Sequence, residues 1–199
     1  MSLFHNLLVK AVQVMPTKAV WFFSKNYIAG NTLTDAVNKV KELNSKGILA
    51  TLDVLGESIN NEEEAVAAKI EALKVLDAIH ENKLNANLSI KPTQMGLSIN
   101  EDFAYKQILE LVHKAKQINN FVRIDMEDSP YTDLTINVYK KIFQEYKNVG
   151  IVLQAYLKRT YDDAVILNKL STNYRLCKGI YVEPAEFLIR INKQSGKII

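Results

Sequence analysis

The sequence predicts an α/β fold in which short parallel strands alternate with helices, arranged either as a barrel or as an open sheet. Apolar runs alternate five times with segments of helical period, and the repeat of ~25–40 residues fits a series of βα units. The runs are nearly continuously apolar, which is typical of parallel strands covered on both faces. No linker divides the chain, so we expect N-terminal helices over residues 1–46 to pack on βα units over residues 47–199.

Three helices are expected ahead of the first strand, over residues 3–14, 17–28 and 32–46. Pro16 separates the first two, and Asn31-Thr32 is a plausible N-cap for the third. From Met1 to Thr34 there are lysines but no acidic residue, a composition shared by targeting segments, membrane-surface helices and amphipathic helices that pack on a domain. The scarcity of Arg and Ser favours packed helices, with a peripheral membrane contact as the alternative.

Five strands and the helices between them follow from the apolar pattern. The expected strands cover residues 47–55, 86–90, 121–124, 149–153 and 174–177. Helical spacing of apolar residues predicts helices over residues 62–83, 102–117 and 134–146, and the alternation predicts a helix after the fifth strand. The single cysteine, Cys177, is expected as a small apolar residue inside the last strand.

Composition argues against several classes of function. With 48% apolar and 24% charged residues, the chain resembles an ordinary soluble globular protein. The net charge of +3 forms no basic stripe, which argues against nucleic acid as a partner, and no stretch reaches the ~20 apolar residues of a spanning helix. One cysteine excludes an internal disulfide and fits a reducing, cytoplasmic compartment. No metal site is expected, because His5, His80 and His113 lie on predicted helices without a second ligand at metal spacing.

Polar residues crowd the carboxyl end of every expected strand. The carboxyl ends of parallel strands form the active face of α/β folds, so these side chains should meet across one cleft. In FVRIDMEDSP, residues 121–130, three acids follow an apolar run, and charges gathered in a partly dry cleft need partners. We therefore predict convergence on one face of the sheet for Asp53, Lys91, Asp125, Gln154 and Arg175.

The three acids of this segment have different interpretations. Strand alternation directs Asp125 away from the apolar side chains of its strand. Asp128-Ser129-Pro130 is expected to cap the following helix, which leaves Asp125 available for function. Glu127 and Asp128 are interpreted as structural residues.

The remaining polar positions differ in how strongly they indicate function. Arg175 lies inside a strand, where an unpaired guanidinium is costly, so an anionic partner is expected. Lys91 fits an active-face lysine as well as one that extends to solvent, and Gln154 fits either a site residue or a partner of loop amides. Lys178-Gly179 offers a glycine where backbone can approach a ligand.

Read together, the strand ends resemble the proline dehydrogenase family. The matching segments are ATLDVLGE (50–57), LSIKPTQMGL (88–97), VRIDMEDSPYTD (122–133), VLQAYLKRT (152–160) and YRLCKGIYVEP (174–184). The resemblance covers residues 15–187 and implies a partial (βα)8 barrel of the TIM type, with five βα units present. It implies an oxidoreductase of proline catabolism, a flavoprotein in which FAD accepts a hydride from L-proline. The product would be Δ1-pyrroline-5-carboxylate, and a membrane quinone would take the electrons.

The resemblance also assigns roles to single residues. Lys91 matches the lysine that pairs with the substrate carboxylate and the acid cluster, and Asp125 matches the active-site aspartate. Met126 matches the neighbour whose backbone meets the flavin, and Gln154 matches a glutamine on the isoalloxazine. Arg175 matches the arginine near the reactive edge of the flavin. The cofactor-binding turn corresponds to Lys178, Gly179 and Ile180, although many family members have alanine or serine at the last position.

Five βα units are fewer than the eight of a closed barrel. We therefore expect a fragment or a C-terminal truncation that exposes two sheet edges and an apolar barrel interior and oxidises little or no proline by itself. Two other functions stay open from the residues alone. One is a Schiff-base aldolase that uses Lys91 or Lys178, and the other is a non-catalytic remnant that pairs with another chain.

Overall fold

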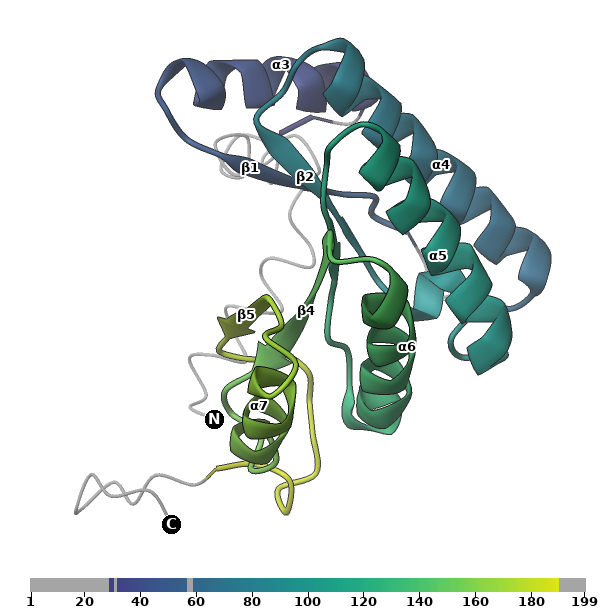
Figure 1. Cartoon of the computed structure of the whole chain (residues 1–199), viewed down its shortest axis with the longest axis vertical. Coiled ribbons are helices and arrows are strands. Elements are labelled where there is room, and N and C mark those ends of the chain that lie inside the picture. The colour runs from purple at the N-terminus through teal and green to yellow at the C-terminus, as the bar shows by residue number, and fades with distance from the viewer. Residues whose placement is uncertain (1–28, 31, 57–58, 190–199) are drawn as a thin grey trace, which may run out of the picture.

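The computed structural model describes residues 29–30, 32–56 and 59–189, so the helices expected over residues 3–14 and 17–28 lie outside the described residues. In this part of the chain, five parallel strands alternate with helices (Figure 1). The strands are β1 (Ala50–Asp53), β2 (Ala86–Ile90), β3 (Val122–Ile124), β4 (Val149–Gln154) and β5 (Tyr174–Cys177). The helices are α3 (Leu33–Ser45), α4 (Glu62–Glu81), α5 (Glu101–Gln117), α6 (Thr132–Glu145) and α7 (Thr160–Asn168), with 3-10 turns η1 (Thr93–Met95) and η2 (Ser129–Tyr131).

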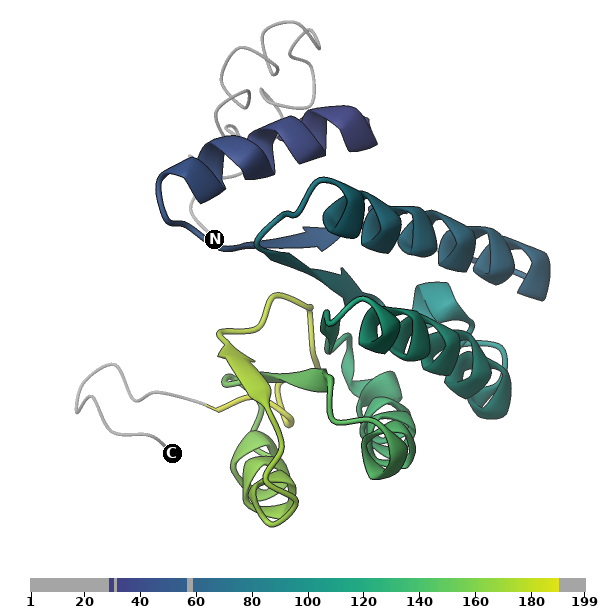
Figure 2. The ribbon, with the colours of Figure 1, turned by 45° about the horizontal axis from the view of Figure 1, so that its top comes forward.

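The order of the strands distinguishes a barrel from a doubly wound sheet. Each strand from β2 on pairs in parallel with the strand before it, in the order β1-β2-β3-β4-β5. The strand order therefore never reverses, as it does in a doubly wound sheet. Helices α4 to α7 consequently form an arc outside the curled sheet, as Figure 2 shows. This arrangement is part of a (βα)8 barrel and confirms the predicted fold class.

The two faces of the sheet differ in chemistry. The outer face packs on the helices, and its core side chains are at most 2% exposed: Leu88, Ile90, Val122, Ile124, Ile151 and Leu153. The inner face of the first three strands is polar, with Thr51 Oγ1 donating to Asn87 Oδ1 (3.0 Å) next to Asp53 and Ser89. The expectation of an exposed apolar barrel interior is therefore wrong for these strands, because hydrogen-bonded polar groups line it.

Side-chain caps define where the helices begin. Thr32 Oγ1 accepts a hydrogen bond from the Asp35 backbone N–H (3.2 Å), and the Asp35 carboxylate accepts one from the Thr32 N–H (3.1 Å). This capping box confirms the predicted start of the third helix. Asn61 and Asn100 cap α4 and α5 with their side-chain oxygens, which accept from the backbone N–H groups of Glu64 and Phe103. Helix α3 packs on α4 and β1, and its Val40 is buried. The division of the chain into N-terminal helices up to residue 46 and βα units from residue 47 stays a prediction.

Two predicted elements differ from the structure. The first strand is shorter than residues 47–55, because β1 pairs with β2 only over Ala50–Asp53, and Leu49 is 69% exposed. The helix expected after the fifth strand is not found in residues 178–189, and the described residues end there. Residues 178–189 instead fold back on the loop after β4, where the Lys158 N–H donates to the Phe187 carbonyl (2.9 Å). Cys177 lies in β5 as expected, half-buried and free.

None of the helices in the described residues is long and apolar enough to cross a membrane.

Candidate active site

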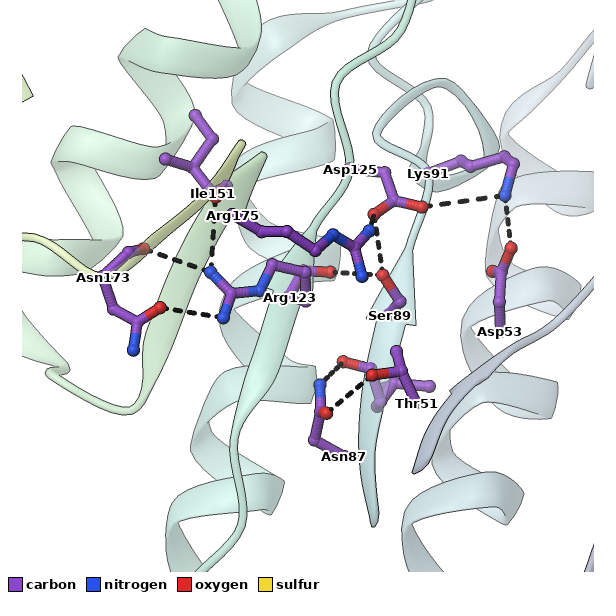
Figure 3. A network of polar contacts seen from close by, with 11 residues as sticks. Thr51, Asp53, Asn87, Ser89, Lys91, Arg123, Asp125, Ile151, Asn173 and Arg175 are labelled. Carbon is purple, nitrogen blue, oxygen red and sulfur yellow. Dashed lines mark hydrogen bonds and ion pairs between the residues drawn. The ribbon is translucent and has the colours of Figure 1, made fainter. Parts of the chain in front are cut away.

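Charged side chains from four strands meet at the carboxyl-end rim of the sheet (Figure 3). Lys91, directly after β2, forms an ion pair with Asp53 at the end of β1, and its Nζ lies 3.9 Å from Asp125 Oδ2. On the other side of Asp125, Arg175 Nη2 donates to Oδ1 at 2.9 Å. The predicted convergence of these four residues is confirmed, and it forms one chain of alternating charge from β1 to β5.

Ser89 is a member of this cluster that sequence reasoning missed. Its hydroxyl donates to Asp125 Oδ1 (2.8 Å), and its side chain is almost fully buried. The same carboxylate oxygen thus accepts from Ser89 and Arg175, which fixes the Asp125 side chain from two directions. The signal was present in the strand period, because Ser89 lies two residues before Lys91 and therefore on the same face of β2.

The Asp53 carboxylate lies in an unfavourable environment for a negative charge. Burial raises its pKa above the ordinary range, and the negative charge of Asp125 raises it further, while the ion pair with Lys91 opposes both effects. Asp53 Oδ1 is buried and has no hydrogen-bond partner among the described residues. Among the rim carboxylates, Asp53 therefore keeps its negative charge mainly because Lys91 pairs with it.

Gln154 lies at the carboxyl end of β4, and the strand register puts it on the same face of the sheet as the charged cluster, as predicted. Its side chain is 2% exposed, and its Nε2 donates to the backbone carbonyl of Glu127 (2.8 Å). The Glu127 carboxylate accepts from the Thr93 backbone N–H (2.8 Å) and from its hydroxyl (2.7 Å), which agrees with a structural interpretation of Glu127. Burial raises the pKa of Glu127, and the two bonds from Thr93 partly offset this. Met126 is buried in the core beside it.

The predicted cap at Asp128 is wrong. Asp128 occupies the N-cap position of η2, but its side chain makes no capping hydrogen bond. The Ser129 N–H donates instead to Glu183 Oε1 (2.8 Å), a nearly buried carboxylate that arrives from the segment after β5. A local motif could not reveal this partner, because it lies 54 residues away in sequence.

The turn after β5 is open to solvent on one side. Gly179 has a φ of +103°, and a Cβ there would lie 2.2 Å from the ring of Tyr156, so both the backbone and the packing require glycine. Lys178 is exposed, Ile180 is 87% exposed, and the Arg175 side chain is 45% exposed. Two cationic side chains are thus exposed in this region, Arg175 from β5 and Lys178 from the turn that follows it.

The histidines of the described residues form no metal site. No group of three or more His, Cys, Asp or Glu side chains in this part of the chain could hold a metal ion. His113 lies between Tyr146, with Nδ1 2.8 Å from the phenol oxygen, and Gln117, with Nε2 3.0 Å from the amide nitrogen.

Fold and rim together define a class of protein: a partial α/β barrel whose carboxyl-end rim carries alternating acidic and basic side chains. A sequence model of proline dehydrogenase matches residues 36–184. The chain is 40% identical over 162 residues to proline dehydrogenase 1 of Bacillus subtilis strain 168, which covers 81% of this chain and 54% of the relative. It is 30% identical over 179 residues to the proline dehydrogenase of Deinococcus radiodurans, covering 87% of this chain and 58% of the relative. The chain belongs to the proline dehydrogenase family.

A solved structure extends the likeness to the fold. Proline utilization A from Bdellovibrio bacteriovorus, inactivated by N-propargylglycine, matches with a TM-score of 0.73 and 22% identity. The match covers 88% of this chain and 22% of that one. The chain spans about half the length of the curated relatives it matches.

Proposed function

We propose that the chain provides the substrate- and flavin-facing rim of a proline dehydrogenase, which oxidises L-proline to Δ1-pyrroline-5-carboxylate with FAD as the hydride acceptor. The observation that carries the proposal is the charge cluster Lys91–Asp125–Arg175 at the carboxyl-end rim of β2, β3 and β5. Family membership supports the same chemistry. A Schiff-base aldolase is no longer favoured, because Lys91 is engaged in an ion pair with Asp53 and the family is that of an oxidoreductase.

The cluster suits a zwitterionic amino acid. A proline carboxylate needs a cation, and Lys91 is the cation at the centre of the rim, with its side chain 28% exposed. The secondary ammonium of proline needs an acceptor, and Asp125 Oδ2 lies on the side of the carboxylate that is not occupied by Ser89 and Arg175. Asp53 would keep Lys91 oriented along the rim by its ion pair. The rim therefore offers both charges that proline requires.

The open turn after β5 fits an anionic, partly apolar cofactor. Arg175 uses one nitrogen for Asp125, which leaves the rest of a half-exposed guanidinium for a ligand. Lys178 adds a second cation, Gly179 keeps the backbone accessible, and Ile180 provides an exposed apolar side chain. These residues would hold FAD together with Gln154 and the backbone of Met126. The side chains of Gln154 and Met126 are buried.

FAD supplies the hydride acceptor, and the chain's own residues provide orientation and charge. Hydride transfer increases the negative charge on the acceptor, and a nearby guanidinium stabilises that charge. Arg175 is held for this task by Asp125 at 2.9 Å, and Asp125 is held by Ser89 at 2.8 Å. Electrons would leave to a membrane quinone, and a peripheral contact with the inner membrane face would bring a cytoplasmic protein close to it.

The proposal is tested by restoring a full-length family member. Residues 1–189 of this chain are joined to the part of Bacillus subtilis proline dehydrogenase 1 that the chain does not match. We expect a yellow protein whose bound flavin is bleached by L-proline under anaerobic conditions and which reduces a quinone analogue. A flavin-loaded chimera that proline does not reduce would overturn the proposal. Borohydride trapping of a carbonyl substrate on Lys91 or Lys178 would restore the aldolase alternative.

A further inference from the structure

The polar layer beneath the ion pairs contains an arginine that the proposed catalysis does not use. Arg123 lies on the inner face of β3, two residues before Asp125 (Figure 3). Its Nη1 donates to the carbonyl oxygens of Asn173 (3.2 Å) and Ile151 (3.3 Å), and its Nη2 donates to Asn173 Oδ1 (2.8 Å). The guanidinium thus extends from β3 across β4 to the residue that precedes β5.

This path across β4 requires glycine at position 150. Arg123 pairs in register with Gly150. A Cβ on Gly150 would lie 2.4 Å from Arg123 Nη1, 2.6 Å from the Asn173 carbonyl oxygen and 2.6 Å from the Phe121 ring. The guanidinium carbon of Arg123 lies over the ring of Phe121, 4.8 Å from the ring centroid. The Arg123 guanidinium therefore occupies the space that a side chain at position 150 of β4 would fill.

Two contacts connect β3 with β5 across β4, and they are one strand period apart. Arg123 reaches Asn173, and two residues further along both strands Arg175 reaches Asp125 at 2.9 Å. Among the described strands, β5 pairs through its backbone with β4 alone. These two side-chain contacts connect the segment that contains β5 with the inner face of β3. A displacement of Asn173 would also move Arg175, because Tyr174 alone separates the two residues along the chain.

Placing Arg123 here has an electrostatic cost. Burial lowers the pKa of Arg123, and the positive charge of Arg175 lowers it further. Two carbonyl oxygens, the side-chain oxygen of Asn173 and the face of Phe121 offset this cost. The Arg123 fork reaches these three acceptors from two separate nitrogens, whereas a lysine carries all its donors on a single nitrogen.

We propose that Arg123 is a positioning residue, which holds the start of β5 through Asn173 so that Arg175 stays in reach of Asp125. Gly150 is the small residue that makes this arrangement possible. The proposal concerns the placement of Arg175 and rests on the proposed function only for what Arg175 then does to a bound flavin.

Hydrogen exchange of the flavin-free full chain tests the placement. We expect Arg123→Gln to raise the exchange of the amides in Tyr174–Cys177 by ~10-fold, with less than ~2-fold change in Ala86–Ile90. Arg123→Lys should not restore protection, because an ammonium cannot make the planar fork. Asn173→Ala should raise exchange in the same segment, whereas Asn173→Asp keeps an acceptor oxygen and should keep protection.

A second measurement follows the ion pair itself. In ¹⁵N NMR spectra the Nη signals of Arg175 should be resolved in the native protein and in Asn173→Asp, because the bond to Asp125 slows rotation of the guanidinium. They should collapse in Arg123→Gln and Asn173→Ala. Should Arg123→Gln fail to fold, the two Asn173 variants decide the outcome, because Asn173 is exposed.

Two results would overturn the proposal. One is unchanged exchange and unchanged Arg175 signals in the Arg123→Gln and Asn173→Ala proteins. The other is faster exchange in all five strands alike, which would make Arg123 a general stabilising residue. Neither measurement uses flavin or proline, so a failure of proline-dependent flavin reduction is a separate result.

Discussion

The rim of the sheet has two halves that differ in how far their side chains are exposed to solvent. In the paired half, Lys91 forms ion pairs with both Asp53 and Asp125, and Thr93 in the turn after β2 donates to the Glu127 carboxylate. In the open half, Ile180 and the Arg175 side chain are 87% and 45% exposed, and Lys178 is exposed.

The difference indicates what each half has to bind. A cluster that satisfies its own charges is preorganised and can receive a small zwitterion with little movement. Exposed cationic and apolar groups suit a large cofactor that covers them on binding. Asp125 belongs to both halves through Lys91 and Arg175, so it connects the substrate side with the flavin side.

The largest expected effect is that of Arg175→Ala on turnover in the flavin-loaded chimera. One charge-stabilising donor is worth ~10²–10³ in rate, whereas the cofactor keeps its other contacts. We expect the rate of proline-dependent flavin reduction to fall by this factor, with a much smaller change in bound flavin. Lys158→Ala, an exposed cation outside the cluster, is the matched control. Loss of flavin with unchanged activity per bound flavin would contradict the assignment.

Gly179→Ala should have the largest effect on stability in the open half. A positive φ and a Cβ 2.2 Å from the Tyr156 ring combine backbone strain with overpacking, at a cost of about 3 kcal/mol. Gly47→Ala is the matched control, because Gly47 has a φ of +75° and no atom within 4 Å of an added Cβ. It should cost about 1 kcal/mol in urea unfolding. Equal losses in the two variants would show that Tyr156 yields and that the turn is not constrained by packing.

Much of this comparison could be predicted from the sequence, because it depends on strand period and chain order. Asp125, Lys91 and Arg175 follow from polar residues placed at the ends of apolar runs. The partner of Ser129 and the contact between Arg123 and Asn173 could not be predicted, because each joins residues 50 or more positions apart through the curl of the sheet.

The polarity of the barrel interior was also missed, for a physical reason. Apolar runs suggested strands buried on both faces, yet Thr51, Asn87 and Ser89 alternate with the apolar residues on β1 and β2. Short hydroxyl and amide side chains are easily counted as neutral positions within an apolar run. Their hydrogen bonds to one another and to Asp125 show that they line a polar interior.

In the paired half, Asp125→Asn should destabilise the protein by about 1–2 kcal/mol. Asparagine keeps the shape and one acceptor oxygen but removes the charge between Lys91 and Arg175, and Asp125 is only partly shielded from solvent. Glu42→Gln is the control, because Glu42 pairs with Lys39 and Lys46 on the exposed surface of α3, where solvent screens the charges, so this variant should change stability less. Urea unfolding at neutral pH measures both, and equal small changes would mean that the rim pairs are worth no more than surface pairs.

The smallest expected effect is the contribution of Glu127, in the paired half, to the pH dependence of the free energy of unfolding. Burial raises the pKa of Glu127 in the folded protein above its ordinary value of 4.5, so the folded state holds more protons than the unfolded state in the interval above that value. The free energy of unfolding should therefore fall as the pH rises through this interval and be highest below it. Glu127→Gln removes this titration, so the stability of the native protein relative to the variant should decrease as the pH rises. Asp53, whose pKa is raised as well, titrates in both proteins and cancels in the difference. Unfolding curves collected from acidic to neutral pH test this sign, and a difference that grows with pH would show that the bonds from Thr93 outweigh burial.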